Sequence, residues 1–206
     1  MTNNDEKSKI ILDYGNIPEM IKQYESSIRR HLGVLPTLKE HKFSLVFEQN
    51  YEQIRQCIAL GLHGCAIPSL GALVEQLLDE AIIKRKEQRN SCLLTDEEKE
   101  VIYKKGLSKT IDLAAEEEVI DSQLAGDLKN FAGKVRNLYS HGAYLEIVKD
   151  ADLPEELKKF DDYVVDALKK WGRDVVWSVK YFNWLDTIIF RISTRLDELQ
   201  TGGGKD

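Results

Sequence analysis

Three side chains that could cleave a phosphodiester lie close together in the stretch 134–142, which reads KVRNLYSHG. Arg136 carries a fixed positive charge on a planar group whose donors match phosphate oxygens. His141 has a side chain that can both accept and donate a proton near neutral pH. Asn137 precedes His141 by four residues, so on a regular helix the two would share one face. Arg136, Asn137 and His141 are therefore the candidate catalytic residues.

The residues around these three extend the motif. Lys134 would add local positive charge, and Tyr139 and Ser140 are candidates for positioning a substrate. Gly142 is suited to end the helix, because glycine readily takes the left-handed conformation found just beyond helix C-termini. The polar groups would then converge at a helix end, where a ligand can reach them.

RNA cleavage by internal attack needs a base for the 2′-hydroxyl, an acid for the 5′-oxygen and charge stabilisation on the phosphorane. One imidazole cannot act on both sides of the phosphorus, and His31, His41 and His63 are all distant in sequence. A homodimer with the motif at its two-fold axis would supply a second His141 and a second Arg136. We therefore expect at least a homodimer, and we expect no metal or cofactor.

The composition predicts one helical domain that positions this motif. A chain of 206 residues can bury one core but is short for two full domains. Its 42% apolar and 31% charged residues are typical of a soluble globular protein, and four prolines favour helices. We expect a helical extension over 1–42, an all-α bundle over 43–200 and a flexible tail over 201–206.

In the first half of the chain, capping residues and apolar spacing predict three helices. One begins at Ile17, and Ser44 caps the next. Gly61 and Gly64 are expected to end that second helix, and Pro68 to begin the third. The third has an apolar stripe at helical spacing, formed by Leu70, Leu73, Val74, Leu77, Leu78, Ala81 and Ile82.

In the second half, Thr95 caps a short helix and Asp121 caps the helix that carries the motif. The three glutamates at 116–118 are expected to be a solvated, acidic helix end. A charged amphipathic helix is predicted over 155–170, and a separate long helix over 173–200.

The arrangement Arg136-Asn137, three residues, His141 resembles the Arg-polar-x-x-x-His motif of HEPN domains. These are small helical modules common in prokaryotic toxin–antitoxin, CRISPR and antiphage systems. The stretch 68–78 resembles the second element of that fold, and the resemblance covers residues 43–199. It implies a HEPN-like bundle with two motifs facing across a dimer cleft. Glu75 reads as a surface carboxylate, although the resemblance implies an acidic residue near the motif arginine.

Two functions stay open. The first is a metal-independent endoribonuclease of a bacterial toxin or antiphage-defence system, which leaves 2′,3′-cyclic phosphate ends and has an antitoxin or defence partner protein. The second is a catalytically silent HEPN-like module that dimerises and binds a partner or nucleotide. A net charge of −6 excludes a general polyanion binder, so RNA would need a local basic patch. A basic surface around the motif favours the first function and an acidic surface favours the second.

The remaining signals concern location. The N-terminal residues 1–7 are polar, so no signal peptide is expected, and no membrane association either, because no apolar run approaches the ~20 residues of a membrane span. Cys57, Cys65 and Cys92 are scattered and odd in number, as expected for reduced thiols. We expect a cytoplasmic protein.

Overall fold

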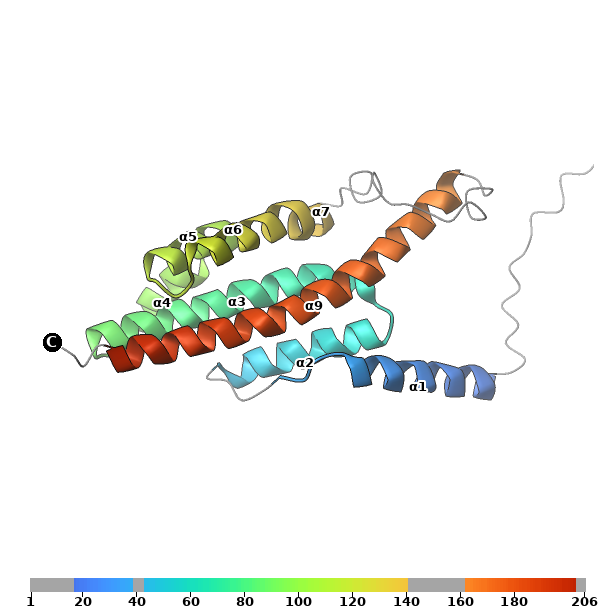
Figure 1. Ribbon diagram of the computed structural model, residues 1–206, viewed down its shortest axis with the longest axis horizontal. Helices are drawn as coiled ribbons and strands as arrows, with labels where there is room; N and C mark the ends of the chain where they lie inside the picture. The colour runs from blue at the N-terminus through green and yellow to red at the C-terminus, as the bar shows by residue number, and fades with distance from the viewer. Residues whose placement is uncertain (1–16, 39–42, 141–161, 203–206) are drawn as a thin grey trace, which may run out of the picture.

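The structure is a computed structural model, and it describes residues 17–38, 43–140 and 162–202 (Figure 1). The elements in chain order are α1 (Ile17–Val34), α2 (Leu45–Ala59), α3 (His63–Asn90), α4 (Asp96–Tyr103), α5 (Leu107–Glu116), α6 (Ser122–Phe131), the π-helical turn η2 (Ala132–Arg136), α7 (Asn137–Ser140) and α9 (Asp162–Gly202). This part of the chain contains no strand, which confirms the predicted all-α bundle with a long C-terminal helix. None of its helices is long and apolar enough to cross a membrane.

The two longest helices, α3 and α9, lie side by side and run in the same direction (Figure 1). At their first halves, Nδ1 of His63 and Oγ of Ser178 are 2.8 Å apart. At their far ends, both helices contact Glu118. Nη2 of Arg85, on α3, lies 3.9 Å from Oε2 of Glu118, and Nε of Arg195, on α9, donates to the backbone oxygen of Glu118 at 3.1 Å. Helices α1 and α2 cover one side of this pair, and α4 to α7 cover the other.

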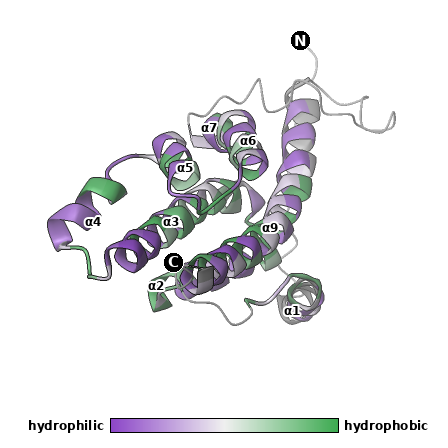
Figure 2. Ribbon diagram, turned by 60° about the vertical axis from the view of Figure 1, so that its left-hand side comes forward, coloured by the Kyte–Doolittle hydropathy of each residue, from purple (hydrophilic) through white to green (hydrophobic). Residues whose placement is uncertain are grey.

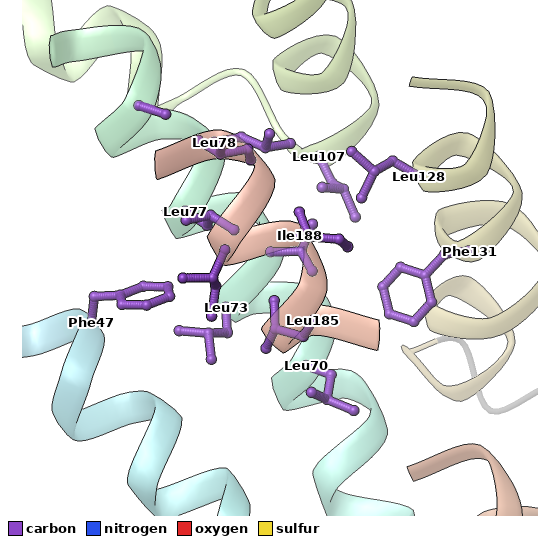
Figure 3. Close-up of a cluster of buried hydrophobic side chains, with 14 of the residues drawn as sticks. Phe47, Leu70, Leu73, Leu77, Leu78, Leu107, Leu128, Phe131, Leu185 and Ile188 are labelled. Carbon is purple, nitrogen blue, oxygen red and sulfur yellow. The ribbon is translucent and has the colours of Figure 1, made fainter. Parts of the chain in front are cut away.

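The core forms around α3, whose apolar residues are buried against several neighbours at once (Figure 3). Every residue of the predicted α3 stripe is buried, which confirms that prediction. Figure 3 shows the convergence of Phe47 from α2, Leu70, Leu73, Leu77 and Leu78 from α3, Leu107 from α5, Leu128 and Phe131 from α6, and Leu185 and Ile188 from α9. Each such side chain stabilises the fold by about 1.5–3 kcal/mol relative to its exposed state. The surrounding helices carry both hydrophobic and hydrophilic residues, as the green and purple parts of α9 in Figure 2 show.

The predicted helix caps are confirmed. The Ser44 hydroxyl accepts a hydrogen bond from the third backbone N–H of α2, at 3.2 Å. Thr95 and Glu98 form a reciprocal capping box at the start of α4. The Asp121 carboxylate accepts from a backbone N–H of α6 at 2.7 Å. These contacts are local, so the sequence alone specifies them.

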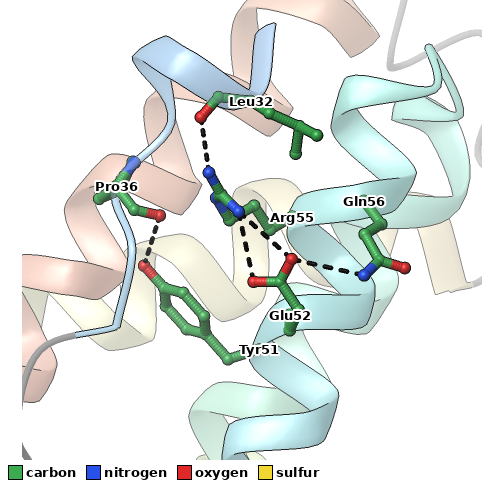
Figure 4. A network of polar contacts seen from close by, with 6 residues as sticks. All are labelled: Leu32, Pro36, Tyr51, Glu52, Arg55 and Gln56. Atoms are coloured by element: carbon green, nitrogen blue, oxygen red, sulfur yellow. Dashed lines mark hydrogen bonds and ion pairs between the residues drawn. The ribbon is translucent and has the colours of Figure 1, made fainter. Parts of the chain in front are cut away.

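Helix α1 packs on α2 through a small polar network (Figure 4). Arg55 donates to the backbone oxygen of Leu32 at 2.6 Å, in the last turn of α1, where a helix presents unpaired carbonyl groups. Glu52 orients Arg55 at 3.2 Å, and the Tyr51 hydroxyl donates to the Pro36 oxygen at 3.3 Å. The described part of the predicted N-terminal extension is therefore attached to the bundle.

The predicted start of the third helix at Pro68 is wrong, because α3 begins at His63 and contains Pro68 in its second turn. Gly61 ends α2 with a φ of 76°, as expected, but Gly64 does not interrupt α3. A Cβ atom at Gly64 would lie 3.0 Å from Oδ2 of Asp174. The glycine therefore permits a close approach of α3 to α9.

The predicted break between the helices at 155–170 and 173–200 is also wrong. Helix α9 continues through Gly172 as one element of 41 residues, and it includes Thr201 and Gly202 of the predicted tail. One glycine inside a helix costs only about 1 kcal/mol relative to alanine, which is too little to end the helix. The start of the 155–170 prediction lies outside the described residues.

The acidic end of α5 is not fully solvated as predicted. The Glu117 side chain is only 8% exposed, and its carboxylate lies 2.7 Å from Nζ of Lys86 and 2.9 Å from Nη1 of Arg89. A carboxylate buried to this degree needs such partners. Glu117 therefore attaches the end of α5 to the last turns of α3.

A second buried carboxyl group, Asp79, lies between α3 and α5 and is only 4% exposed. Burial raises its pKa to about 7, the charge of Glu75 adds to the rise, and the Thr110 hydroxyl partly opposes both effects. Within the described residues, neither Oδ1 of Asp79 nor Oγ1 of Thr110 reaches hydrogen-bond geometry with a partner. Burial without full compensation therefore dominates at this position.

We expect Asp79→Asn to stabilise the protein at pH 8. The folded-state pKa of Asp79 lies above its unfolded value, so the folded protein binds the extra proton between about pH 4 and pH 7. Stability should therefore fall as pH rises through that range, and the free energy of unfolding gained by Asp79→Asn should disappear near pH 4. Urea unfolding at several pH values measures this gain. Asp127→Asn, at an exposed position of α6, is the control and should leave the pH dependence unchanged.

Candidate functional site

The described part of the motif, residues 134–140, lies on one helical segment that contains a π turn. Asp121 caps α6, and the buried residues Leu124, Leu128, Phe131 and Val135 hold the segment against the core. From Ala132 to Arg136 the segment is π-helical, and the backbone N–H of Asn137 donates to the oxygen of Ala132. A π turn holds one more residue than an α-helical turn, and such turns are frequent at functional sites. The sequence predicted a regular helix here and missed this feature.

Arg136 lies at the end of the π turn, and its aliphatic stem crosses α3 at Gly71. A Cβ atom on Gly71 would lie 2.3 Å from Cγ of Arg136, far inside van der Waals contact. The guanidinium continues along α3 to Glu75, with Nη2 3.9 Å from Oε2. The Arg136 side chain is 31% exposed and that of Glu75 is 21% exposed. The arginine is thus oriented by α3 while part of it stays accessible.

Asn137 and Arg136 lie together, as predicted. Nη1 of Arg136 donates to Oδ1 of Asn137 at 3.2 Å, and the Asn137 side chain is half-buried. This contact fixes the direction in which the guanidinium points. The predicted role of Asn137 in orienting phosphate stays a prediction.

Tyr139 attaches the motif to α9. Its hydroxyl donates to Oδ1 of Asp174 at 2.5 Å, and Nζ of Lys170 lies 2.6 Å from Oδ2 of the same carboxylate. The Tyr139 ring packs against Trp177, with the ring centroids 6.0 Å apart. Burial raises the pKa of Tyr139, and the hydrogen bond and charge of Asp174 raise it further, so the phenol stays protonated. Its predicted contact with substrate stays a prediction, because the hydroxyl is here engaged by Asp174.

The other predicted site residues are placed only in part. Lys134, in the π turn, and Ser140, the last residue of α7, are both exposed. His141 and Gly142 lie outside the described residues. The structure therefore brings Arg136 and Asn137 together, and His141 follows the described residues directly in sequence.

Charges of both signs surround the described part of the motif. The cations are Arg136, Lys170 and Arg173, whose guanidinium lies 5.0 Å from the centre of a neighbouring tryptophan ring. The carboxylates are Glu75 and Asp174. Lys134, exposed in the π turn, is a further cation of the motif. Within the described residues no three His, Cys, Asp or Glu side chains are grouped so as to hold a metal ion.

Sequence reasoning missed Gly71 and Asp174. It favoured a surface role for Glu75, whereas the resemblance implied an acidic residue near Arg136, and Glu75 does lie there. Gly71 and Glu75 are four residues apart on α3, so they share one face, but nothing local shows that this face meets the motif. Asp174 lies on a helix face next to a lysine, which resembles an ordinary surface pair. Their contacts with Arg136 and Tyr139 are long-range and depend on how α3 and α9 pack.

We expect Tyr139→Phe to lower the free energy of unfolding by about 2 kcal/mol, the usual scale for a hydrogen bond to a charged group. The change keeps the ring and its packing on Trp177 and removes only the bond to Asp174. The control is Tyr181→Phe, on a neighbouring ring whose hydroxyl makes no hydrogen bond within the described residues. It should cost much less in urea unfolding, and equal losses in the two variants would contradict a stabilising role for the Asp174 contact.

Comparisons of this chain with models of known protein families, with curated proteins and with solved structures found no match. The resemblance to HEPN domains therefore stays an expectation from the sequence, carried by the motif residues, the stretch 68–78 and the helix order. The role of each residue at this site has to be argued from its contacts and its chemistry.

Proposed function

We propose that the protein is a metal-independent endoribonuclease whose site contains Arg136, Asn137 and His141. The observation that supports this most is the placement of Arg136. Its guanidinium is fixed by α3 and by Asn137, is partly accessible, and lies five positions before a histidine. A fixed arginine can stabilise the charge on the phosphorane and a histidine can transfer protons, and phosphodiester cleavage needs both functions.

In this reaction the 2′-oxygen forms a bond to phosphorus and the bond to the 5′-oxygen breaks. The imidazole of His141 in one subunit accepts the proton of the 2′-hydroxyl. The imidazole of a second His141, protonated at the start, donates a proton to the leaving 5′-oxygen. Arg136 stabilises the charge that develops on the phosphorane, and Asn137 keeps the guanidinium in line. The products are a 2′,3′-cyclic phosphate and a 5′-hydroxyl.

The second imidazole comes from a second copy of the chain. The proposal therefore includes a homodimer in which the Arg136 and His141 residues of the two subunits face one another. Large apolar side chains on the part of α9 near the motif are exposed and available for such an interface, namely Trp171 at 64% and Val176 at 61%. The resemblance to HEPN domains adds the cellular context of a bacterial toxin or antiphage-defence effector, restrained by an antitoxin or another partner protein.

The alternative function is a catalytically silent HEPN-like module that dimerises and binds a partner protein or nucleotide. Two contacts favour it. Glu75 offsets part of the charge of Arg136, and Asp174 occupies the Tyr139 hydroxyl. The cations around the motif favour the ribonuclease, so we place the silent module second.

We expect the purified protein to cleave RNA in the presence of a chelator and to leave a substrate without 2′-hydroxyl groups intact. Arg136→Ala and His141→Ala should each lower the rate by on the order of a hundredfold or more, the scale for losing a charge stabiliser or a general acid–base. Arg136→Lys should not restore the rate, because a point charge replaces a planar fork. Asn137→Ala should have a smaller effect. Rates come from end-labelled RNA, and the cyclic phosphate is identified by mass spectrometry.

The matched control for Arg136→Ala is Arg191→Ala, which removes an arginine paired with Asp121 near the opposite end of α9. It should keep the wild-type rate. Wild-type rates in both Arg136→Ala and His141→Ala would show that the catalytic assignment is wrong. If the wild-type protein cuts no RNA after any partner is removed, the binding-module function replaces the ribonuclease.

We also expect a dimer in analytical ultracentrifugation at micromolar concentration. Because one site needs two imidazoles, an excess of His141→Ala subunits should inhibit wild type, after subunit exchange, more strongly than simple dilution does. An equal excess of Arg191→Ala subunits should not inhibit. A monomer at working concentration would contradict the composite site. So would a loss of activity, on mixing with His141→Ala subunits, no greater than that from diluting the wild-type protein.

A further inference from the structure

The interior of α3 contains a glycine where an alanine would favour the helix by about 1 kcal/mol. This residue, Gly71, is buried and lies among residues that fill the core. Its backbone is helical, so no unusual conformation requires a glycine. The requirement comes instead from Arg136, because a Cβ atom on Gly71 would lie 2.3 Å from its Cγ, 3.2 Å from its Cβ and 3.3 Å from its Cδ.

We propose that Gly71 is a positioning residue for Arg136, and that its missing side chain sets the path of the arginine toward the reaction centre. The catalytic part of this inference rests on the ribonuclease function proposed above. The structural part, that Gly71 determines where the guanidinium lies, stands on the contacts alone.

The crowding at Gly71 could not be relieved by the arginine side chain by itself. Rotation about the Cα–Cβ bond of Arg136 would move Cγ away, but Cβ is fixed to the backbone and would remain at 3.2 Å. An alanine at position 71 would therefore force another rotamer of Arg136 and also require the π turn to move by a few tenths of an ångström. The change of rotamer removes the guanidinium from its present contacts.

The guanidinium has two contacts, one with Glu75 on α3 and one with Asn137 on α7. Glu75 follows Gly71 by four residues, so it lies on the same face of α3, and there it faces Nη2 of Arg136 at 3.9 Å. Asn137 accepts from Nη1 at 3.2 Å. Gly71 thus sets the stem, and Glu75 and Asn137 set the two ends of the fork. Arg136 is the last residue of the π turn, so the widened backbone of that turn also meets α3 at Gly71.

The first test is a thermodynamic cycle, measured as the thermal midpoint of Gly71→Ala, of Arg136→Ala and of the double variant. Gly71→Ala should lower the midpoint in the wild-type background. It should lose most of that effect in the Arg136→Ala background, because Cγ and Cδ of the arginine are then absent. Gly126→Ala is the control, since Gly126 is exposed on α6 with no atom within 4 Å of its Cβ position. It should not lower the midpoint in either background.

Equal effects of Gly71→Ala in the two backgrounds would overturn the inference, because the glycine would then act independently of Arg136. Where Gly71→Ala alone does not fold, recovery of folding in the double variant supports the inference. Failure of both to fold overturns it.

The second test measures RNA cleavage below the thermal midpoint of every variant, where each is folded by circular dichroism. Gly71→Ala should lower kcat by roughly tenfold to a hundredfold, the scale for displacing a catalytic group by about an ångström, while Gly126→Ala keeps the wild-type value. In the Arg136→Ala background, Gly71→Ala should cause no further loss. A merely structural glycine would lower the midpoint but leave kcat of the folded enzyme unchanged, and that result would overturn the positioning role. If wild type cuts no RNA, the ribonuclease proposal fails, and the cycle of thermal midpoints still decides whether Gly71 positions Arg136.

Discussion

The structure depends on one constraint, which is that α3 must be covered on nearly every side. Its apolar residues extend around most of the helix, as expected for a helix at the centre of a bundle rather than at its surface. Helix α2 covers one side, α9 runs along another, and α5 and the π turn close the remainder. Because α3 is covered in this way, its polar residues also contact other elements. Asp79 faces α5, and Glu75 faces the motif arginine.

Local chemistry could be predicted from the sequence, and most of the fold follows from it. Ser44, Thr95 and Asp121 cap their helices as expected, because a capping contact joins residues three positions apart. The helix boundaries at Pro68 and Gly172 could not be predicted in this way. At Pro68, burial of α3 against neighbouring helices outweighs a local cost of a few kcal/mol. At Gly172, the cost of a glycine inside a helix is only about 1 kcal/mol, too small to end the helix.

The sequence indicated the polar residues of the candidate site, but it did not indicate the residues that hold them in position. Arg136 and Asn137 could be identified from their types and spacing, since those reflect chemistry. Gly71, the π turn and Asp174 could not, because each acts through a residue that is distant in sequence or through a backbone irregularity. Glu117 is a similar case, since three consecutive glutamates read as a solvated end until α3 supplies the lysine and arginine that surround it.

The strength of the contact between Arg136 and Glu75 bears directly on whether the site can bind a phosphate. At 3.9 Å and with both side chains partly exposed, this ion pair contributes no more than about 1 kcal/mol. A phosphate that takes two parallel hydrogen bonds from the guanidinium forms a shorter and stronger interaction. In the proposed ribonuclease, an incoming phosphodiester would therefore displace Glu75 at little cost, while Gly71 and Asn137 still hold the arginine stem and one nitrogen in place. A fully buried, tightly paired arginine would lack this property, because a large desolvation and pairing energy would oppose the exchange. The loose pair on a firmly held stem is an arrangement suited to catalysis, since it orients the charge without neutralising it.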